Sequence, residues 1–145
     1  MNKINVTDAR KDMSTFFDGV IHEKPIILKK RKYEAVLIEK SLLKEFLEND
    51  KLEVKTASED NNKVVLTIPL LNLVAEGSSR VEAIENLCEN AFAYANDVYD
   101  NFMFYYYGQN IKDKLGYIFN ILLCEDNNEL KELFEFAIPK KSKKK

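Results

Sequence analysis

The residues best suited to chemistry in this 145-residue sequence are cations near its N-terminus. Arg10 follows the segment Ile4-Asn5-Val6-Thr7-Asp8-Ala9, and the basic run Lys29-Lys30-Arg31-Lys32 lies between two apolar stretches. Arginine can bind phosphate or guanine edges, whereas phosphate contacts by lysine carry no sequence information. The pattern indicates binding to a polyanion, although an ordinary exposed loop would carry the same four cations.

Enzymatic chemistry has little support in the sequence. His22 is the only histidine, and no serine or cysteine is placed to form a nucleophile pair with it. Phosphate-binding glycine loops and metal-ligand clusters are missing. A nuclease of the RNase H type needs several converging carboxylates, and the expected strands at 52–56 and 64–68 offer only Glu53. We therefore predict a protein that is not an enzyme and that needs neither cofactor nor metal.

Composition indicates a globular protein of the cytoplasm. Hydrophobic residues make up 46% of the chain, which is enough for a core, but no stretch is long enough to span a membrane. The N-terminus lacks the apolar block of a secretory signal. Cys88 and Cys124 form no CxxC pair and fit buried hydrophobes in a reducing compartment.

The charge is divided along the chain. Residues 1–33 hold eight basic and four acidic side chains, whereas residues 51–139 hold seven basic and fifteen acidic ones. A basic module suits a polyanion and an acidic one suits a basic protein, although solvated surface charge gives similar counts. Residues 140–145 are expected to form a disordered Lys-rich tail, with non-specific nucleic-acid contact as the alternative.

The N-terminal stretch predicts a compact module of strands and helices. A strand at 3–6 precedes a helix with Thr7 as its N-cap, and strands at 26–28 and 35–38 flank the basic run. A second helix follows, with Leu43, Phe46 and Leu47 as its apolar positions. The first helix carries a stripe at spacings of three and four that we expect in the core: Ala9, Met13, Phe16, Phe17 and Val20.

This order of elements resembles the prevent-host-death (Phd/YefM) antitoxin family over residues 2–49. The matching residues are Ile4-Asn5-Val6-Thr7-Asp8-Ala9-Arg10, Ser14, Phe17, Pro25-Ile26-Ile27-Leu28, Arg31 and Ala35-Val36-Leu37-Ile38. Family members dimerise through this module and bind palindromic operator DNA. One departure concerns the hairpin turn, where the family usually has glycine and this chain has Lys32-Tyr33.

The resemblance implies that Arg10 and Arg31 are the principal DNA contacts. Sequence-independent affinity would come from Lys3, Lys11, Lys29, Lys30 and Lys32. Phosphate oxygens can accept hydrogen bonds from Asn5, Thr7 and Ser14, and the alternative role for Thr7 is helix capping alone. A dimer would present two copies of these groups with a spacing set by its symmetry.

The pattern restarts after residue 50 and predicts a second domain of α+β class. Strands are expected at 52–56, 63–68 and 73–75. Ser79-Arg80-Val81-Glu82 has the form of a capping box, and it opens a long helix. The apolar side of that helix comprises Val81, Ile84, Leu87, Cys88, Ala91, Ala95, Val98 and Phe102.

Residues 51–100 resemble the small domain of HicB-like antitoxins. The match is Glu76-Gly77-Ser78-Ser79-Arg80-Val81-Glu82-Ala83-Ile84-Glu85-Asn86. The resemblance implies a small antiparallel sheet with a helix that covers a toxin and has no established catalysis of its own. An RNA-cleaving toxin would have a basic surface, which carboxylates can cover. The candidate toxin-binding residues are Glu82, Glu85, Glu89, Asp97 and Asp100, although a helix buried on one face is normally charged on the other.

Residues 103–108, Met-Phe-Tyr-Tyr-Tyr-Gly, form an aromatic segment that can stack on bases in principle. No basic residue interleaves with it, so we expect a helix end packed under two last helices, at 111–123 and 127–136. Asp126 is the expected cap of the last helix, with Glu129 three residues later. These helices can extend the core, the dimer interface or a toxin-binding surface, and the sequence does not choose among the three.

The sequence therefore predicts an α+β antitoxin with three segments: a DNA-binding and dimerisation module at 1–50, an acidic toxin-binding domain at 51–139, and the tail. Its partners would be operator DNA, a cognate toxin and further copies of itself, with no membrane. The alternatives are a dimeric transcriptional regulator whose second domain binds another partner or only oligomerises, and an assembly protein without a DNA role. A toxin gene next door would separate the antitoxin from the regulator.

Overall fold

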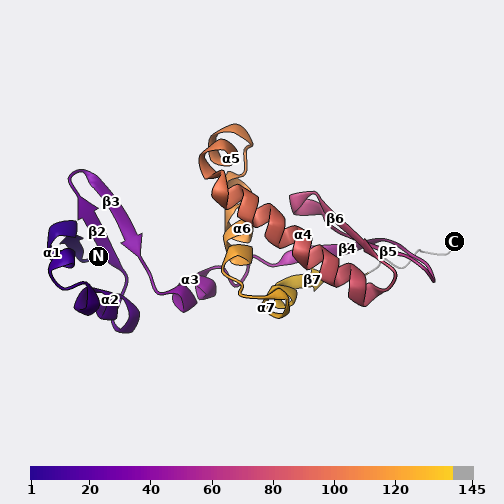
Figure 1. Ribbon diagram of the computed structural model, residues 1–145, viewed down its shortest axis with the longest axis horizontal. Coiled ribbons are helices and arrows are strands. Elements are labelled where there is room, and N and C mark those ends of the chain that lie inside the picture. The colour runs from indigo at the N-terminus through magenta and orange to yellow at the C-terminus, as the bar shows by residue number, and fades with distance from the viewer. Residues whose placement is uncertain (139–145) are drawn as a thin grey trace. The chain divides into compact units, whose positions relative to one another are not determined.

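The computed structural model describes residues 1–138, so the predicted tail at 140–145 lies outside the described residues. Contacts divide the chain into two compact units (Figure 1). The N-terminal unit is Met1–Phe46, and the C-terminal unit begins at Leu47. Each unit combines helices with a small mixed sheet, which makes the protein α+β.

The N-terminal unit has a three-stranded sheet in the order β1-β2-β3. β1 runs parallel to β2, and β2 pairs antiparallel with β3. A small core of Ala9, Phe16, Val20 and Ile26 joins the helices to the sheet. The elements are β1 (Lys3–Asn5), α1 (Val6–Lys11), α2 (Met13–His22), β2 (Ile26–Lys30), β3 (Tyr33–Leu37) and α3 (Lys40–Phe46).

The expected first helix is divided into two helices, because the helical conformation is interrupted at Asp12. The Asp12 carboxylate accepts hydrogen bonds from the Thr15 backbone nitrogen at 3.1 Å and from the Thr15 hydroxyl at 2.7 Å, and so caps α2. These bonds lower the pKa of the Asp12 carboxyl. The expectation that Thr7 is an N-cap was also wrong. Asn5 still pairs with Lys29 in the sheet and Val6 already begins α1, so Thr7 lies inside the helix.

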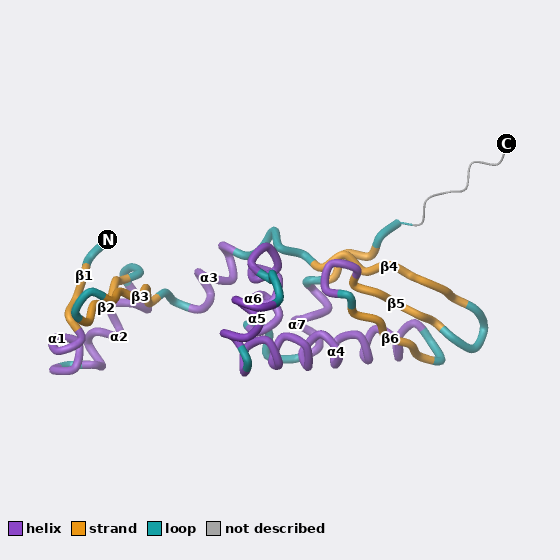
Figure 2. The backbone as a smooth tube through the Cα atoms, turned by 90° about the horizontal axis from the view of Figure 1, so that it is seen from above, coloured by secondary structure: helices purple, strands orange, loops and turns teal. Residues whose placement is uncertain are grey.

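The C-terminal unit has a four-stranded sheet in the order β6-β5-β4-β7, with α4 packed along it (Figures 1 and 2). Apolar side chains of the strands, α4, α6 and α7 form one core. The strands are β4 (Leu52–Glu59), β5 (Val64–Ile68), β6 (Leu73–Gly77) and β7 (Phe134–Phe136). The helices are α4 (Arg80–Asp100), α5 (Phe102–Gly108), α6 (Leu115–Leu122) and α7 (Asn127–Glu132), with short 3-10 turns at Pro69–Leu71 and Lys112–Lys114.

The sheet of the C-terminal unit is mixed, which corrects the expected antiparallel sheet. The last predicted helix ends early, and its final residues form β7 instead. β7 runs parallel to β4, with Leu52 opposite Phe134 and Val54 opposite Phe136. Phe134 is thereby buried beside Leu52, 82 residues earlier in the chain, a contact that local periodicity does not reveal.

Local capping signals were read correctly in this unit. The Ser79 hydroxyl accepts a hydrogen bond from the Glu82 backbone nitrogen at 3.2 Å, and Asp126 accepts one from the Glu129 nitrogen at 2.9 Å. Gly77 lies where the first turn of α4 approaches β6 closely. A Cβ atom there would overlap the backbone of Ala83, so only glycine fits without a shift of the chain.

Within residues 1–138, no helix is both long and apolar enough to cross a lipid bilayer.

Candidate functional site

The N-terminal unit brings the start of α1 beside the basic run. Because β1 pairs parallel with β2 and leads directly into α1, the first turn of that helix lies next to the end of the β2–β3 hairpin. An open hollow of about 330 Å³ is formed there. Its lining residues are Asn5, Val6, Thr7, Asp8, Lys29, Lys30 and Arg31. Hydrogen-bonding side chains and cations thus face one solvent-open space, as phosphate binding requires.

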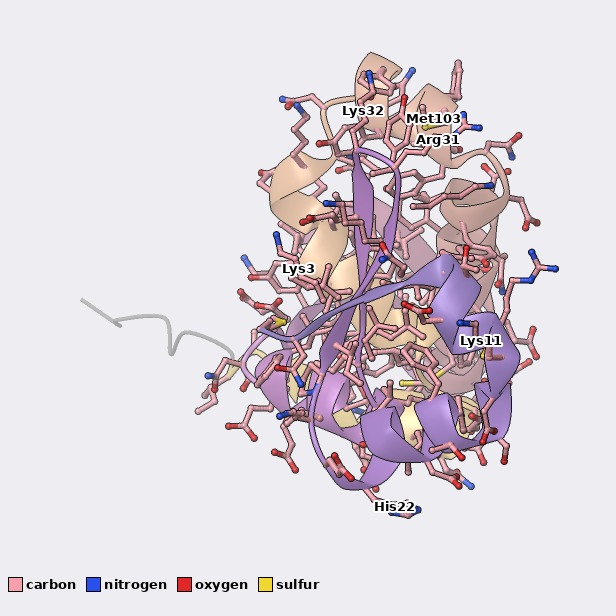
Figure 3. All side chains as sticks on the ribbon, turned by 90° about the vertical axis from the view of Figure 1, so that its left-hand side faces the viewer. Lys3, Lys11, His22, Arg31, Lys32 and Met103 are labelled. Carbon is pink, nitrogen blue, oxygen red and sulfur yellow. The ribbon has the colours of Figure 1, made fainter. Side chains whose placement is uncertain are left out.

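Arg31 occupies a special place in the hairpin. Lys30 pairs with Tyr33, so Arg31 and Lys32 form a two-residue turn, and Arg31 has a positive φ of 55°. Positive φ at the first central position only is the sign pattern of a type II′ turn, where glycine is preferred. The chain therefore keeps an arginine at a position where its backbone is strained. The exposed Arg31 and Lys32 lie at the end of the hairpin, opposite His22 (Figure 3).

The remaining DNA-contact candidates lie outside this hollow. Arg10 and Lys11 are exposed in the last turn of α1, and Ser14 is exposed at the start of α2. Lys11 forms an ion pair with Asp8 at 3.4 Å, while Lys3 pairs with Glu34 at 3.0 Å on the other side of the unit in Figure 3. The Nζ atom of Lys32 lies 5.5 Å from the centre of the Tyr33 ring.

An apolar groove lies on the same unit between α2 and the end of β3. Ala9, Phe16 and Val20 are buried as predicted, but Met13 and Phe17 are 51% and 55% exposed. A continuous helix would have placed Met13 and Phe17 on the same side as Ala9. The interruption at Asp12 changes the direction of these side chains relative to α1. The groove is lined by Phe17, Val20, Ile21, Val36, Leu37, Ile38, Glu39 and Lys40.

Three of the five acidic candidates in the C-terminal unit have internal partners. Glu82 accepts hydrogen bonds from the backbone and hydroxyl of Ser78, and Glu85 binds Lys131 and Asn127. These contacts lower the pKa of both carboxyls. Asp97 accepts hydrogen bonds from Asn101 and from the Tyr105 hydroxyl. Glu89 and Asp100 are exposed on α4.

Comparison with known proteins shows the family. Residues 1–136 match the PHD-like family, which is described as the antitoxin of RelE/RelB toxin–antitoxin systems. The chain belongs to this antitoxin family. A 1.80 Å crystal structure of the antitoxin part of a candidate toxin/antitoxin system from Syntrophomonas wolfei subsp. wolfei is similar, with a TM-score of 0.83 at 28% identity. The similarity covers 94% of this chain and 99% of that one, whereas comparison with curated proteins gave no match.

Within residues 1–138, the histidine and the buried cysteine have different surroundings. His22 is exposed at the end of α2, and Cys88 is buried in the core, where burial raises the pKa of its thiol to about 11. Among residues 1–138, no group of three His, Cys, Asp or Glu side chains is arranged to hold a metal ion.

Sequence reasoning missed two features of this antitoxin. The expected packing of residues 103–108 under the last helices was half wrong, because Met103, Phe104 and Tyr107 are exposed. Only Tyr105 and Tyr106 of that segment are half-buried. The second feature is Asn120, which is buried in α6. The exposed side of residues 103–108 could not be predicted, because nearly every residue there is apolar or aromatic. Asn120 could have been noticed as a single polar residue within an apolar helix.

Proposed function

We propose that this antitoxin neutralises its cognate toxin by direct binding and represses its own operon by binding operator DNA. In this proposal the N-terminal unit is a Phd/YefM-like module that dimerises and binds DNA, and the C-terminal unit is a HicB-like domain that binds the toxin. The protein acts in the cytoplasm without catalysis of its own. An RNA-cleaving toxin fits the acidic C-terminal unit, because carboxylates complement a basic RNA-binding surface.

The hollow beside the hairpin is the observation that carries the DNA half of the proposal. It gathers Asn5 and Thr7 with Lys30 and Arg31 on an open surface. Thr7 does not cap α1, so its hydroxyl is available for a phosphate oxygen. Arg10, Lys11, Ser14 and Lys32 extend the contact beyond the hollow, and Arg10 and Arg31 are the side chains that we expect to matter most.

Dimerisation through the N-terminal unit would cover its apolar groove. Phe17 and Val36 are both more than half exposed there, although they are apolar. A second copy bound in this groove would remove both side chains from water, which favours association. Two-fold symmetry then presents two hairpins to the two halves of a palindromic site.

Gel-shift titration of the full chain on its own upstream DNA tests the DNA-binding residues. Arg10→Ala combined with Arg31→Ala should weaken binding about 100-fold, since each arginine contact contributes on the order of 1–3 kcal/mol. Affinity of the wild type should fall steeply with salt, and the double variant should have a shallower salt slope. Lys24→Ala with Lys44→Ala removes the same charge from the same unit and should change affinity little. Unaltered binding by the arginine variant would refute the assignment.

Light scattering tests the dimer. Phe17→Asp places a charge in the apolar groove without disturbing a buried side chain, so circular dichroism should stay unchanged. The variant should have the mass of a monomer and should lose most of its affinity for the palindrome. A variant that remains dimeric would place the interface elsewhere.

A further inference from the structure

The outward face of α5 is an exposed aromatic surface at the end of α4. Met103, Phe104 and Tyr107 lie on one side of this helix at spacings of one, three and four residues. They are 63%, 63% and 74% exposed, and Tyr99 at the end of α4 is 62% exposed. We call these four side chains the α5 surface. Figures 1 and 2 show α5 beyond the end of the sheet, beside α6.

The opposite side of α5 holds the helix in place. The rings of Phe102 and Tyr106 stack with centres 5.6 Å apart. The Phe102 ring also packs against the ring of Phe119 in α6, with ring centres 6.4 Å apart. Tyr105 packs against the core and donates a hydrogen bond to Asp97 of α4. Asn101 donates a further bond to the Asp97 carboxylate at 3.0 Å, so the turn between α4 and α5 is fixed. The exposed aromatic side chains therefore stand on a fixed support, which lowers the entropic cost of binding.

The charges around this surface select the kind of partner. Residues 97–111, which include the end of α4 and all of α5, contain two acidic side chains and no basic one. Asp97 and Asp100 are both exposed and precede α5 directly. The next cation along the chain is Lys112, whose Nζ atom lies 4.9 Å from the centre of the Tyr106 ring. An apolar centre with an acidic margin complements a protein surface whose apolar centre has a basic margin.

We propose that the α5 surface is the docking site for the cognate toxin, with Phe104 and Tyr107 as its anchors and Asp97 and Asp100 facing basic residues of the toxin. This inference rests on the proposed toxin binding, and it locates that binding on the α5 surface. Truncation of aromatic anchors at an interface centre is what costs binding most. Asp97 already accepts hydrogen bonds from Tyr105 and Asn101, so Asp100 has more capacity for a direct bond to a toxin cation, while both carboxylates contribute long-range attraction.

Nucleic acid and a second copy of the chain fit this surface less well. Aromatic platforms that bind single strands combine stacking with cations, whereas the nearest following cation, Lys112, lies over the Tyr106 ring on the opposite side of α5. A symmetric contact between two α5 surfaces would bring the same carboxylates of both copies together, and like charges disfavour it.

Titration calorimetry between the full chain and the protein encoded by the adjacent gene tests this site. Phe104→Ala with Tyr107→Ala should weaken binding about 100-fold, from a loss on the order of 1.4 kcal/mol for each tenfold step. Asp100→Lys should weaken binding about tenfold at low salt and less at high salt. Val74→Ala with Val81→Ala is the matched control, because these side chains are 57% and 73% exposed elsewhere on the same unit, and it should bind like the wild type.

The outcomes distinguish failure of the docking site from failure of the proposed toxin binding. A wild-type chain that does not bind the adjacent gene's product overturns the proposed function, and the docking site with it. Wild-type binding that the aromatic double variant retains overturns the docking site alone. Light scattering compares the mass of the aromatic double variant with that of the wild type in the absence of toxin. A different mass would identify α5 as a contact between copies of the chain, and this result also overturns the docking site. Loss of binding with unchanged mass and unchanged thermal unfolding supports it.

Discussion

At the residue scale, Arg31, the proposed DNA contact, lies at a strained backbone position. Its φ of 55° is strained for any residue with a Cβ, by about 1–2 kcal/mol. Arg31→Gly should therefore raise the free energy of unfolding of the N-terminal unit by about 1 kcal/mol while weakening operator binding about tenfold. Thermal unfolding and gel shift on the same sample check both effects.

Asn72 offers a matched control for that experiment. It has a φ of 54° and caps the short 3-10 turn after β5 in the C-terminal unit. Asn72→Gly should leave operator affinity unchanged, because the residue lies far along the chain from the DNA-contact candidates. If Arg31→Gly left DNA affinity intact, Arg31 would be a turn residue only.

Glu85 gives the protein part of its acid sensitivity. The pKa of its carboxyl is below the ordinary value of 4.5, chiefly because Lys131 and Asn127 hydrogen-bond to the charged form. A lowered pKa in the folded state means that these bonds stabilise the fold above about pH 4.5 and are lost as the pH falls. The melting temperature of Glu85→Gln should therefore fall less than that of the wild type as the pH is lowered below about 4.5. Glu89→Gln removes an exposed carboxylate from the same helix and should leave the slope in place.

Residue types and spacing predicted the local features best. Ser79 and Asp126 were identified as caps because a capping motif depends only on residues within one turn. Thr7 was assigned wrongly, because the pairing of Asn5 with Lys29 decides where α1 begins. The same pairing brings Thr7 beside Arg31, a proximity that the sequence does not display.

At the element scale, Asn120 ties α6 to the first residues of the C-terminal unit. It is 3% exposed, and its Nδ2 atom donates to the carbonyl oxygens of Leu47 at 3.1 Å and Asp50 at 3.0 Å. Asn120→Ala should lower the free energy of unfolding by about 2 kcal/mol, because the Asp50 carbonyl loses this donor and the Leu47 carbonyl keeps only the Asp50 backbone nitrogen. Urea denaturation of the full chain measures this loss.

Two further variants separate the hydrogen bonds of Asn120 from its volume. Asn120→Asp keeps the shape but replaces the amide donor with an acceptor, so it should destabilise at least as much as alanine. Asn128→Ala, at an exposed position of α7, should have little effect. Full stability of the aspartate variant would show that the two bonds contribute nothing.

Elements that depend on distant partners were predicted least well. Residues 134–136 read as the end of a helix, yet they pair with β4 because Leu52 and Val54 leave an edge open beside them. The face of α5 could not be chosen from Met-Phe-Tyr-Tyr-Tyr-Gly, since every position except the last is apolar or aromatic. The stacking of Phe102 on Tyr106 and its contact with Phe119 fix which side points outward.

At the scale of the whole molecule, the two units carry opposite charge and are proposed to have separate partners. The basic residues that face the hairpin hollow belong to the first 33 residues, whereas acidic side chains outnumber basic ones in residues 51–139. In this proposal the antitoxin can lose one partner without losing the other. Variants of Arg10 and Arg31 should therefore spare toxin binding, and variants of the α5 surface should spare operator binding.

Growth rescue tests the central claim, that this chain neutralises a toxin by binding it, most directly. Expression of the adjacent gene alone should arrest growth, and co-expression of the wild-type chain should restore it. The variant with Arg10→Ala and Arg31→Ala should restore growth equally, because neutralisation does not require DNA binding. Persistent arrest in the presence of well-expressed, folded wild-type chain would contradict the account.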